Sequence, residues 1–162
     1  MNELITVDPD TDVAVFNVDP DPCVNRQRIM ALKDFMISMS SGQIEMPVEH
    51  ILLDGMYARK LFIPKGTILI GKIHKKSCIN IVASGDISVM TESGSKRVKA
   101  GYTLVSPAGI QKVGYAHEDT IFINVFRTDE TDIEKIENEI ACESYDDLIA
   151  IENKETPCLL LG

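Results

Sequence analysis

Several residue types and patterns are scarce in this sequence of 162 residues, and each scarcity excludes a class of protein. The chain contains no tryptophan, and aromatic residues make up only 6% of it. No apolar run approaches the roughly 18 residues that a membrane-spanning helix needs, so we expect no membrane span. The first 25 residues contain no Lys or Arg, so we expect no cationic secretory leader.

Several chemistry-bearing motifs are missing as well. None of the four cysteines stands in a Cys-x-x-Cys spacing, which argues against a zinc ribbon and a thioredoxin-type site. We therefore expect reduced thiols and a cytoplasmic protein. The sequence has no Gly-x-Ser-x-Gly elbow and no glycine-rich phosphate loop ending in Gly-Lys-Ser/Thr, so it resembles neither a serine hydrolase nor a nucleoside triphosphatase.

The charge is distributed unevenly along the chain. The formal net charge is −9, of which residues 1–25 carry −6 and residues 128–162 carry −9, whereas residues 26–127 carry +6. Acidic ends that keep the protein soluble explain this pattern. The alternative is that the basic block meets an anion or the acidic ends of a neighbouring copy. The basic clusters lack interleaved aromatics and the acidic ends would repel a phosphate backbone, so the sequence argues against duplex binding.

Turn signals and hydrophobic periodicity divide the chain into four segments. Residues 1–24 contain three Asp-Pro steps, which disfavour helix and predict an extended acidic arm that could dock on a neighbour. Residues 25–42 predict an amphipathic helix, residues 43–127 predict strands, and residues 128–162 predict a second helix followed by an acidic and apolar tail.

Both predicted helices have an apolar face and an N-cap candidate. In the first helix, Asn25 is the candidate cap, and one stripe is formed by Ile29, Leu32, Met36 and Met39. The second is predicted over residues 128–142, where Thr131 and Glu134 match a capping box. Its apolar face consists of Ile133, Ile136 and Ile140.

Short β-branched runs alternate with turn signals through residues 43–127. About eight strands are expected at this spacing, among them Met56–Ile63, Thr67–Ile73, Ile79–Ala83, Ile87–Met90, Lys96–Lys99, Tyr102–Ser106 and Thr120–Phe126. The sequence therefore predicts a mainly β fold, an antiparallel sandwich or barrel with helices on both sides of it in the chain.

Two stretches of this strand block resemble the cupin motifs. GTILIGKIHKKSCINIVASG has the frame of the first motif, from Gly66 to Gly85, and GYTLVSPAGIQKVGY has that of the second, with Gly101, Pro107 and Gly109. Residues 44–145 also look like the cupin-like proteins that tailed phages and prophages encode. The resemblance implies a single cupin-type β-barrel, also described as an RmlC-like jelly roll.

The resemblance implies a metal ion held by three His and one Glu, but this chain departs from that set. The four ligand positions are occupied by Lys72, His74, Cys78 and Lys112. Only His74 keeps the residue type, although a Cys78 thiolate could also ligate. We therefore predict no cofactor, with a divalent metal on His74, Cys78 and a third ligand such as His117 as the alternative.

The substituted positions change the sign of the expected pocket. If the frame holds, Lys72 and His74 point inward from one strand and Lys112 approaches from the facing strand. Two unit positive charges at about 4 Å repel each other by around 4 kcal/mol at an effective dielectric near 20, so two ammonium groups oppose a divalent cation and attract a carboxylate or phosphate. Arg59 and Tyr57 are further candidates for this anion site. The alternative is that both lysines extend to the rim and His74 is an ordinary hydrogen-bonded histidine.

Three functions are compatible with these residues. The first, which we favour, is a non-catalytic protein that binds a small anionic ligand, a nucleotide or a carboxylate, in the pocket. The second is an oligomeric structural or assembly component of a phage particle, with virion proteins as partners. The third is a metal-dependent enzyme with a degenerate ligand set. We expect a homo-oligomer, a dimer or larger, in the host cytoplasm or on a phage particle.

Overall fold

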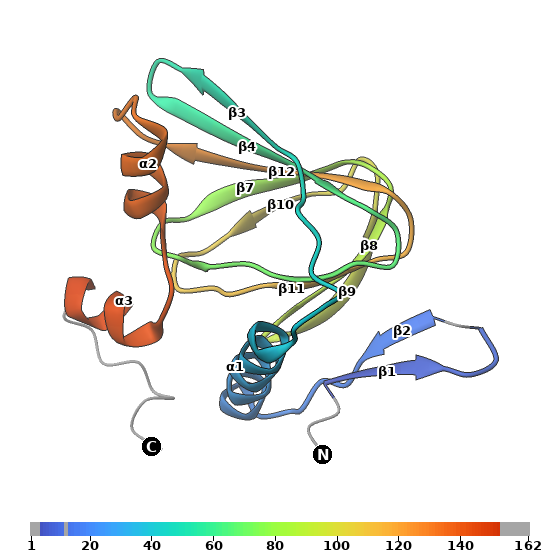
Figure 1. Cartoon of the computed structure of the whole chain (residues 1–162). Helices are drawn as coiled ribbons and strands as arrows, with labels where there is room; N and C mark the ends of the chain where they lie inside the picture. The colour runs from blue at the N-terminus through green and yellow to red at the C-terminus, as the bar shows by residue number, and fades with distance from the viewer. Residues whose placement is uncertain (1–3, 12, 153–162) are drawn as a thin grey trace.

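The computed structural model of the chain describes residues 4–11 and 13–152. It is mainly β, as predicted, and contains two antiparallel sheets of five and four strands. Helix α1 (Pro22–Ser38) and a hairpin formed by β1 (Ile5–Asp8) and β2 (Val13–Phe16) lie at one end of these sheets, as Figure 1 shows. Helix α2 (Ile133–Ile140) lies beside the ends of β4 and β12, whose bounds follow.

The five-stranded sheet has the order β10-β7-β12-β4-β3. In that order its strands span Thr103–Ser106, Cys78–Ser84, Thr120–Arg127, Met56–Ile63 and Val48–Leu53. The predicted strand Met56–Ile63 has the bounds of β4, because its alternating residues face the core and the solvent in turn. The most apolar predicted strand, at 120–126, is β12 in the middle of this sheet, where both neighbours cover its edges.

The four-stranded sheet has the order β5-β11-β8-β9. In that order its strands span Ile68–Ile70, Val113–Ala116, Asp86–Thr91 and Gly94–Lys99. Chain turns connect the two sheets, and the turn between β7 and β8 contains Gly85 at φ +92°. Gly85 is the last glycine of the stretch that resembles the first cupin motif.

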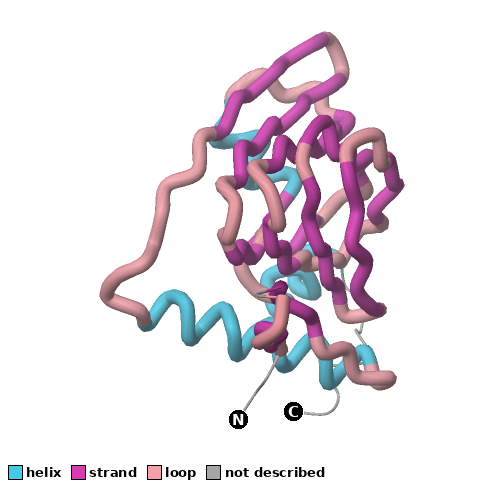
Figure 2. The backbone as a smooth tube through the Cα atoms, turned by 90° about the vertical axis from the view of Figure 1, so that its right-hand side faces the viewer, coloured by secondary structure: helices cyan, strands magenta, loops and turns pink. Residues whose placement is uncertain are grey.

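The two sheets pack face to face around a shared apolar core. One cluster of buried residues takes its members from both sheets: Leu61, Ile63, Val82, Ile87, Val98 and Ala116. Within the described residues no strand pairing joins the two sheets, so the expected closed barrel is wrong and the sheets form an open two-layer arrangement (Figure 2). Alternation along a strand predicts which side chains face inward, but it does not predict which sheet edges pair.

Helix α1 begins and ends earlier than predicted, at Pro22 and Ser38 instead of at 25 and 42. Asp21 is its N-cap, because its carboxylate accepts a hydrogen bond from the Cys23 amide and Pro22 suits the first turn. Asn25, the predicted cap, lies inside the helix. Its side-chain amide donates to the carbonyl oxygens of Asp19 and Glu92 and thus attaches α1 to the turn between β8 and β9.

The N-terminal segment is a hairpin of β1 (Ile5–Asp8) and β2 (Val13–Phe16) instead of an extended arm. Its apolar residues dock on this same molecule, since Leu4 and Phe16 are buried against Ile29 of α1. The stripe of α1 is therefore covered at its N-terminal end, whereas Met39 beyond its C-terminal end is exposed.

Helix α2 is also shorter than the predicted range of 128–142, and its N-cap is Asp132 instead of Thr131. The Asp132 carboxylate accepts a hydrogen bond from the Lys135 amide. The predicted apolar face is present, because Ile136 and Ile140 are buried beneath the five-stranded sheet. The chain continues through β13 (Ala141–Cys142), which pairs with β6 (Ile73–His74), into α3 (Tyr145–Glu152).

Cysteine chemistry differs from the expectation of four reduced thiols. Cys78 and Cys142 form no disulfide, whereas Cys23 is disulfide-bonded. A disulfide between cysteines without a local spacing motif cannot be predicted from the sequence pattern. Cys158 and the apolar Leu159–Leu161 lie outside the described residues. Within the described part of the chain, no helix is long and apolar enough to cross a membrane.

Candidate functional site

A cavity of about 330 Å³ lies between the two sheets. Most of its lining is apolar, and its ionisable or amide side chains are few: Arg59, Lys72, His74, Lys112, Asn124 and Glu137. A mostly apolar cavity with a few convergent polar groups is the usual form of a small-molecule site, and this volume is at the small end of that class.

Arg59 and Asn124 reach the cavity from neighbouring strands of the five-stranded sheet. Asn124 of β12 is paired in register with Arg59 of β4 on one side and with Asn80 of β7 on the other. Residues paired across adjacent strands point to the same face, so the three form a polar row across the inner face of this sheet. The Arg59 guanidinium has no hydrogen bond or ion pair with any described residue.

Two amide atoms of this row are also unsatisfied. The Asn124 Oδ1 and the Asn80 Nδ2 are buried, and neither has a hydrogen-bond partner in the described part of the chain. A buried polar atom without a partner costs roughly 1–3 kcal/mol of stability. The row therefore has spare hydrogen-bonding capacity, and the atom next to the cavity is the Asn124 acceptor.

Lys112 reaches the cavity from the opposite side, immediately before β11. Its backbone carbonyl accepts a hydrogen bond from the Gly71 amide at 2.9 Å, which fixes the two segments to each other. Its Nζ is buried and has no acceptor among the described residues. Burial lowers the pKa of Lys112, and the nearby Cys78 opposes this with a smaller effect.

His74 lines the cavity from β6, and backbone contacts hold it on both sides. Its amide donates to the Ile110 carbonyl and its carbonyl accepts from the Gly109 amide, at 3.0 and 2.7 Å. The imidazole packs edge-on against Phe126, with 5.3 Å between ring centroids. Burial, and then the positive charges of Lys112 and Arg59, lower the pKa of His74 to about 3. His74 is therefore neutral at ordinary pH.

Cys78 is adjacent to His74 but is not part of the cavity lining. Its Sγ lies 3.6 Å from the His74 Nδ1 and donates to the Asn80 Oδ1 at 3.6 Å. Burial raises the pKa of Cys78, so the group is a thiol and not a thiolate at neutral pH.

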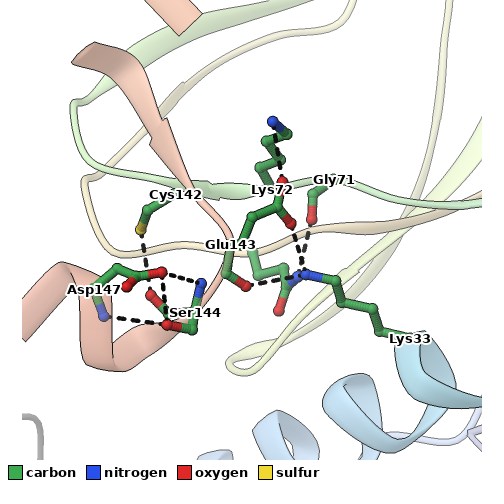
Figure 3. A network of polar contacts seen from close by, with 8 residues as sticks. Lys33, Gly71, Lys72, Cys142, Glu143, Ser144 and Asp147 are labelled. Carbon is green, nitrogen blue, oxygen red and sulfur yellow. Dashed lines mark hydrogen bonds and ion pairs between the residues drawn. The ribbon is translucent and has the colours of Figure 1, made fainter. Parts of the chain in front are cut away.

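Lys72 lines the cavity, but its amine is directed away from the other basic groups that the sequence predicted beside it. Its side chain is 56% exposed, and its Nζ forms an ion pair with the Glu143 Oε1 at 3.0 Å. Lys33 of α1 binds the other carboxylate oxygen of Glu143 at 3.1 Å. Figure 3 shows Lys33 and Lys72 around Glu143, just before the start of α3. The alternative weighed above, a lysine directed to the rim, thus describes Lys72 and not Lys112.

Tyr57 is not among the residues that line the cavity. It is fully buried, and its hydroxyl is 2.8 Å from the Nδ1 of His50. Its ring packs with Phe126 beneath Ile136 and Ile140 of α2, so it belongs to the core at that end of the sheet. Of the five predicted ligand-binding residues, Arg59, Lys72, His74 and Lys112 therefore line the cavity, and the Lys72 amine extends from it to Glu143.

The side chains at the cupin ligand positions do not fit the metal ion that the resemblance implies. Among the described residues, no group of three or more His, Cys, Asp or Glu side chains could hold a metal ion. His117, the suggested third ligand, is engaged instead with the Ser88 hydroxyl at 2.7 Å. The buried Lys112 amine occupies the fourth ligand position, where it would oppose a cation when protonated.

Sequence reasoning did not identify two residues of this region, Glu137 and Glu143. Glu137 of α2 places a carboxylate at the cavity, and Glu143 binds the Lys72 amine and directs it away from the other basic groups. Both come from the segment after the sheets, and no local pattern predicts where that segment docks. Asn124 was detectable, because a polar residue inside an apolar central strand needs a partner.

No family model matches the chain, and no curated protein matches it. Among solved structures it is similar to a conserved protein of unknown function from Streptococcus pyogenes, at 22% identity over 56% of this chain and 80% of that one, with a TM-score of 0.45. It is also similar to KdgF from Halomonas sp., at 18% identity over 59% and 91%, with a TM-score of 0.47.

A further similar structure is a cupin superfamily protein from Desulfitobacterium hafniense. The identity is 8% over 56% of this chain and 84% of that one, and the TM-score is 0.46. Each of these is a likeness of fold, and none assigns a ligand or a reaction to this chain. A phage origin stays a prediction from the sequence resemblance.

Proposed function

We propose that the protein binds a small carboxylate in the cavity between the sheets. The observation that carries this proposal is the buried Lys112 amine, which has no acceptor among the described residues. The Arg59 guanidinium of the same cavity also has no hydrogen bond or ion pair with a described residue. A carboxylate would supply acceptors to both groups, and Arg59 would provide the permanent positive charge.

The remaining lining constrains the size and polarity of the ligand. A volume of about 330 Å³ is at the small end of the range for small-molecule sites, and the mostly apolar lining favours an organic carboxylate over a nucleotide, which is more polar. The Asn124 Oδ1 favours a hydroxyl or another donor on the ligand. Glu137 is the one carboxylate of the lining, and it disfavours a second negative charge near α2.

Calorimetric titration with acetate, propionate, lactate and pyruvate tests this proposal. Binding should weaken by about tenfold or more, or roughly 1.4 kcal/mol, in Arg59→Gln and in Lys112→Met. Lys60→Met is the matched control, because it removes the same group from a lysine outside the cavity lining, where Glu49 holds it. Its affinity should equal that of the wild type.

Two results would contradict the proposal. One is that none of these carboxylates binds to the wild-type protein. The other is that Lys60→Met loses as much affinity as Lys112→Met, which would indicate diffuse surface attraction.

Assembly from several copies is a second candidate, favoured by apolar side chains on the outside of α1. Phe35 and Ile37 are 62% and 67% exposed, and Met30 is about half exposed. Exposed apolar groups of this kind are typical of interaction surfaces. Size-exclusion chromatography with light scattering tests this candidate: a dimer or larger is expected, and a monomer at all concentrations would exclude it.

A further inference from the structure

Anion binding alone does not explain why the second basic group of the cavity is a deeply buried primary amine. An arginine at position 112 would bind a carboxylate with more hydrogen bonds and would never lose its charge. The Lys112 Nζ is instead buried without a partner, and the cavity that Lys112 lines is mostly apolar, with Leu61, Val89 and Phe122 among its lining residues. Desolvated lysines of this kind are nucleophiles toward carbonyl groups.

We propose that the Lys112 amine condenses reversibly with the carbonyl group of a small α-oxo carboxylate bound in this cavity, and so forms an imine. This inference rests on the proposed function, because the carboxylate of the same ligand is held by Arg59. It adds the chemical class of the ligand and a covalent bond to the protein.

The condensation needs no oxidant, reductant or co-reactant. The Nζ lone pair forms a bond to the carbonyl carbon, and the carbonyl π electrons move to the oxygen. The two hydrogens that leave the nitrogen are transferred to this oxygen, which departs as water as the carbon–nitrogen double bond forms. One amine and one ketone thus give one imine and one water, without any change of oxidation state.

The surroundings of Lys112 favour this reaction over simple ion pairing. Burial lowers the pKa of Lys112, so the amine loses its proton more readily than a surface lysine does. No described carboxylate forms an ion pair with it, whereas Lys72 and Lys33 are both bound to Glu143. The mostly apolar lining also limits the water that would hydrolyse the imine.

The other nucleophile of the region is less suited to a carbonyl ligand. Cys78 does not line the cavity, its Sγ donates to Asn80, and burial raises the pKa of its thiol. His74 is neutral and its ring lies against Phe126, so it can accept a proton but carries no charge that would draw the ligand away from Arg59. The structure therefore assigns the bond to Lys112 alone.

Reductive trapping tests the inference. The full-length protein is incubated with pyruvate, α-ketobutyrate or α-ketoisocaproate and sodium cyanoborohydride, and intact-protein and peptide mass spectrometry locate the reduced adduct. We expect one adduct per chain on Lys112, saturable with ligand and suppressed by excess propionate, which has the carboxylate but no carbonyl. The adduct should be lost in Lys112→Met, strongly reduced in Arg59→Gln and unchanged in Lys60→Met, which removes a lysine outside the cavity lining.

The outcomes separate this inference from the function on which it rests. If the α-oxo carboxylates bind in calorimetry but leave no adduct on Lys112, the imine is excluded and carboxylate binding stands. An adduct spread over surface lysines, or retained in Lys112→Met, also overturns the imine. If no carboxylate binds and no adduct forms, both proposals fail. Circular dichroism of each variant confirms that it is folded before the comparison is made.

Discussion

The buried Lys112 amine serves the proposed ligand binding but lowers the stability of the folded protein. A buried amine without an acceptor destabilises the folded protein by roughly 1–3 kcal/mol, whereas a methionine of similar length does not. We therefore expect Lys112→Met to raise the free energy of unfolding by this amount at pH 7, in a denaturant titration without ligand. The increase should shrink toward pH 10, because the folded-state pKa of Lys112 is lowered and the unfolded chain then binds fewer extra protons.

A variant that is less stable than the wild type at pH 7 would contradict this account, since it would show that the amine has an internal partner. The control for this stability measurement is Lys72→Met. It removes an exposed ion pair, so its stability should differ from that of the wild type by less than about 1 kcal/mol.

The second residue-scale prediction concerns acid stability. The folded-state pKa of His74 is lowered to about 3, below the value near 6.5 expected in the unfolded chain. The unfolded chain therefore binds the proton first, and stability falls as the pH drops from about 6.5 toward 3, by at most about 1.4 kcal/mol for each pH unit. His74→Gln removes this proton uptake, so its stability should fall less steeply over the same range.

Denaturant titrations at several pH values between 4 and about 7 measure the two slopes. Parallel slopes for wild type and His74→Gln would mean that the imidazole is solvated in the folded protein. The remaining slope in the variant reports on the other groups whose pKa is lowered in the folded protein, among them His117, by burial, and Asp86, by its hydrogen bonds and ion pair with Arg97.

At the scale of single elements, the turn between β7 and β8 depends on Gly85. Its φ is +92°, and a Cβ built on it would lie 2.4 Å from the Asp119 carbonyl oxygen and 2.6 Å from the Thr120 Cα. Gly55, in the turn between β3 and β4, also has a positive φ of +78°, but a Cβ there meets nothing within 4 Å. A comparison of alanine substitutions at the two glycines therefore distinguishes the cost of backbone strain from the cost of steric overlap.

We expect Gly55→Ala to cost about 1 kcal/mol, from the left-handed backbone alone. Gly85→Ala should cost roughly 1–3 kcal/mol more, because backbone atoms must also move. Thermal and denaturant unfolding of both variants measure this difference. Equal losses would mean that the chain at 119–120 moves aside without cost.

Element-level features were the part of the structure that the sequence predicted best. The run Met56–Ile63 between turn signals predicts β4, and the glycine frame predicts the turn at Gly85, because both depend on neighbouring residues only. Strands β3 and β11 lacked such signals and were not predicted individually. Pairing of sheet edges is decided between segments far apart in the chain, which is why a closed barrel was expected where the structure has two open sheets.

The candidate site was predicted in part for the same physical reason. Strand phase places His74 and Arg59 at the cavity, and the spacing from Gly101 leads to Lys112. Lys72 also lines the cavity, but its amine pairs with Glu143, which belongs to a segment whose docking no periodicity predicts. A flexible side chain between two possible environments is directed by the nearest opposite charge.

At the scale of the whole molecule, Arg26 connects three parts of the structure. Its guanidinium forms an ion pair with Glu92 in the turn between β8 and β9 and lies over the ring of Tyr145, at 3.9 Å from the centroid. The side chain of Arg26 is only 7% exposed. It therefore joins α1, the four-stranded sheet and the start of α3 through one buried charge.

Loss of the carboxylate should leave this charge buried and unpaired. We expect Glu92→Gln to cost roughly 3–5 kcal/mol, the usual loss when one partner of a buried pair is removed. Glu49→Gln is the matched control, because its ion pair with Lys60 is exposed and should contribute less than about 1 kcal/mol. Hydrogen exchange should show faster amide exchange in α1 and near Tyr145 in Glu92→Gln, but not in Glu49→Gln. Similar losses in the two variants would show that α1 is held by its apolar contacts with Leu4 and Phe16 instead of by Arg26.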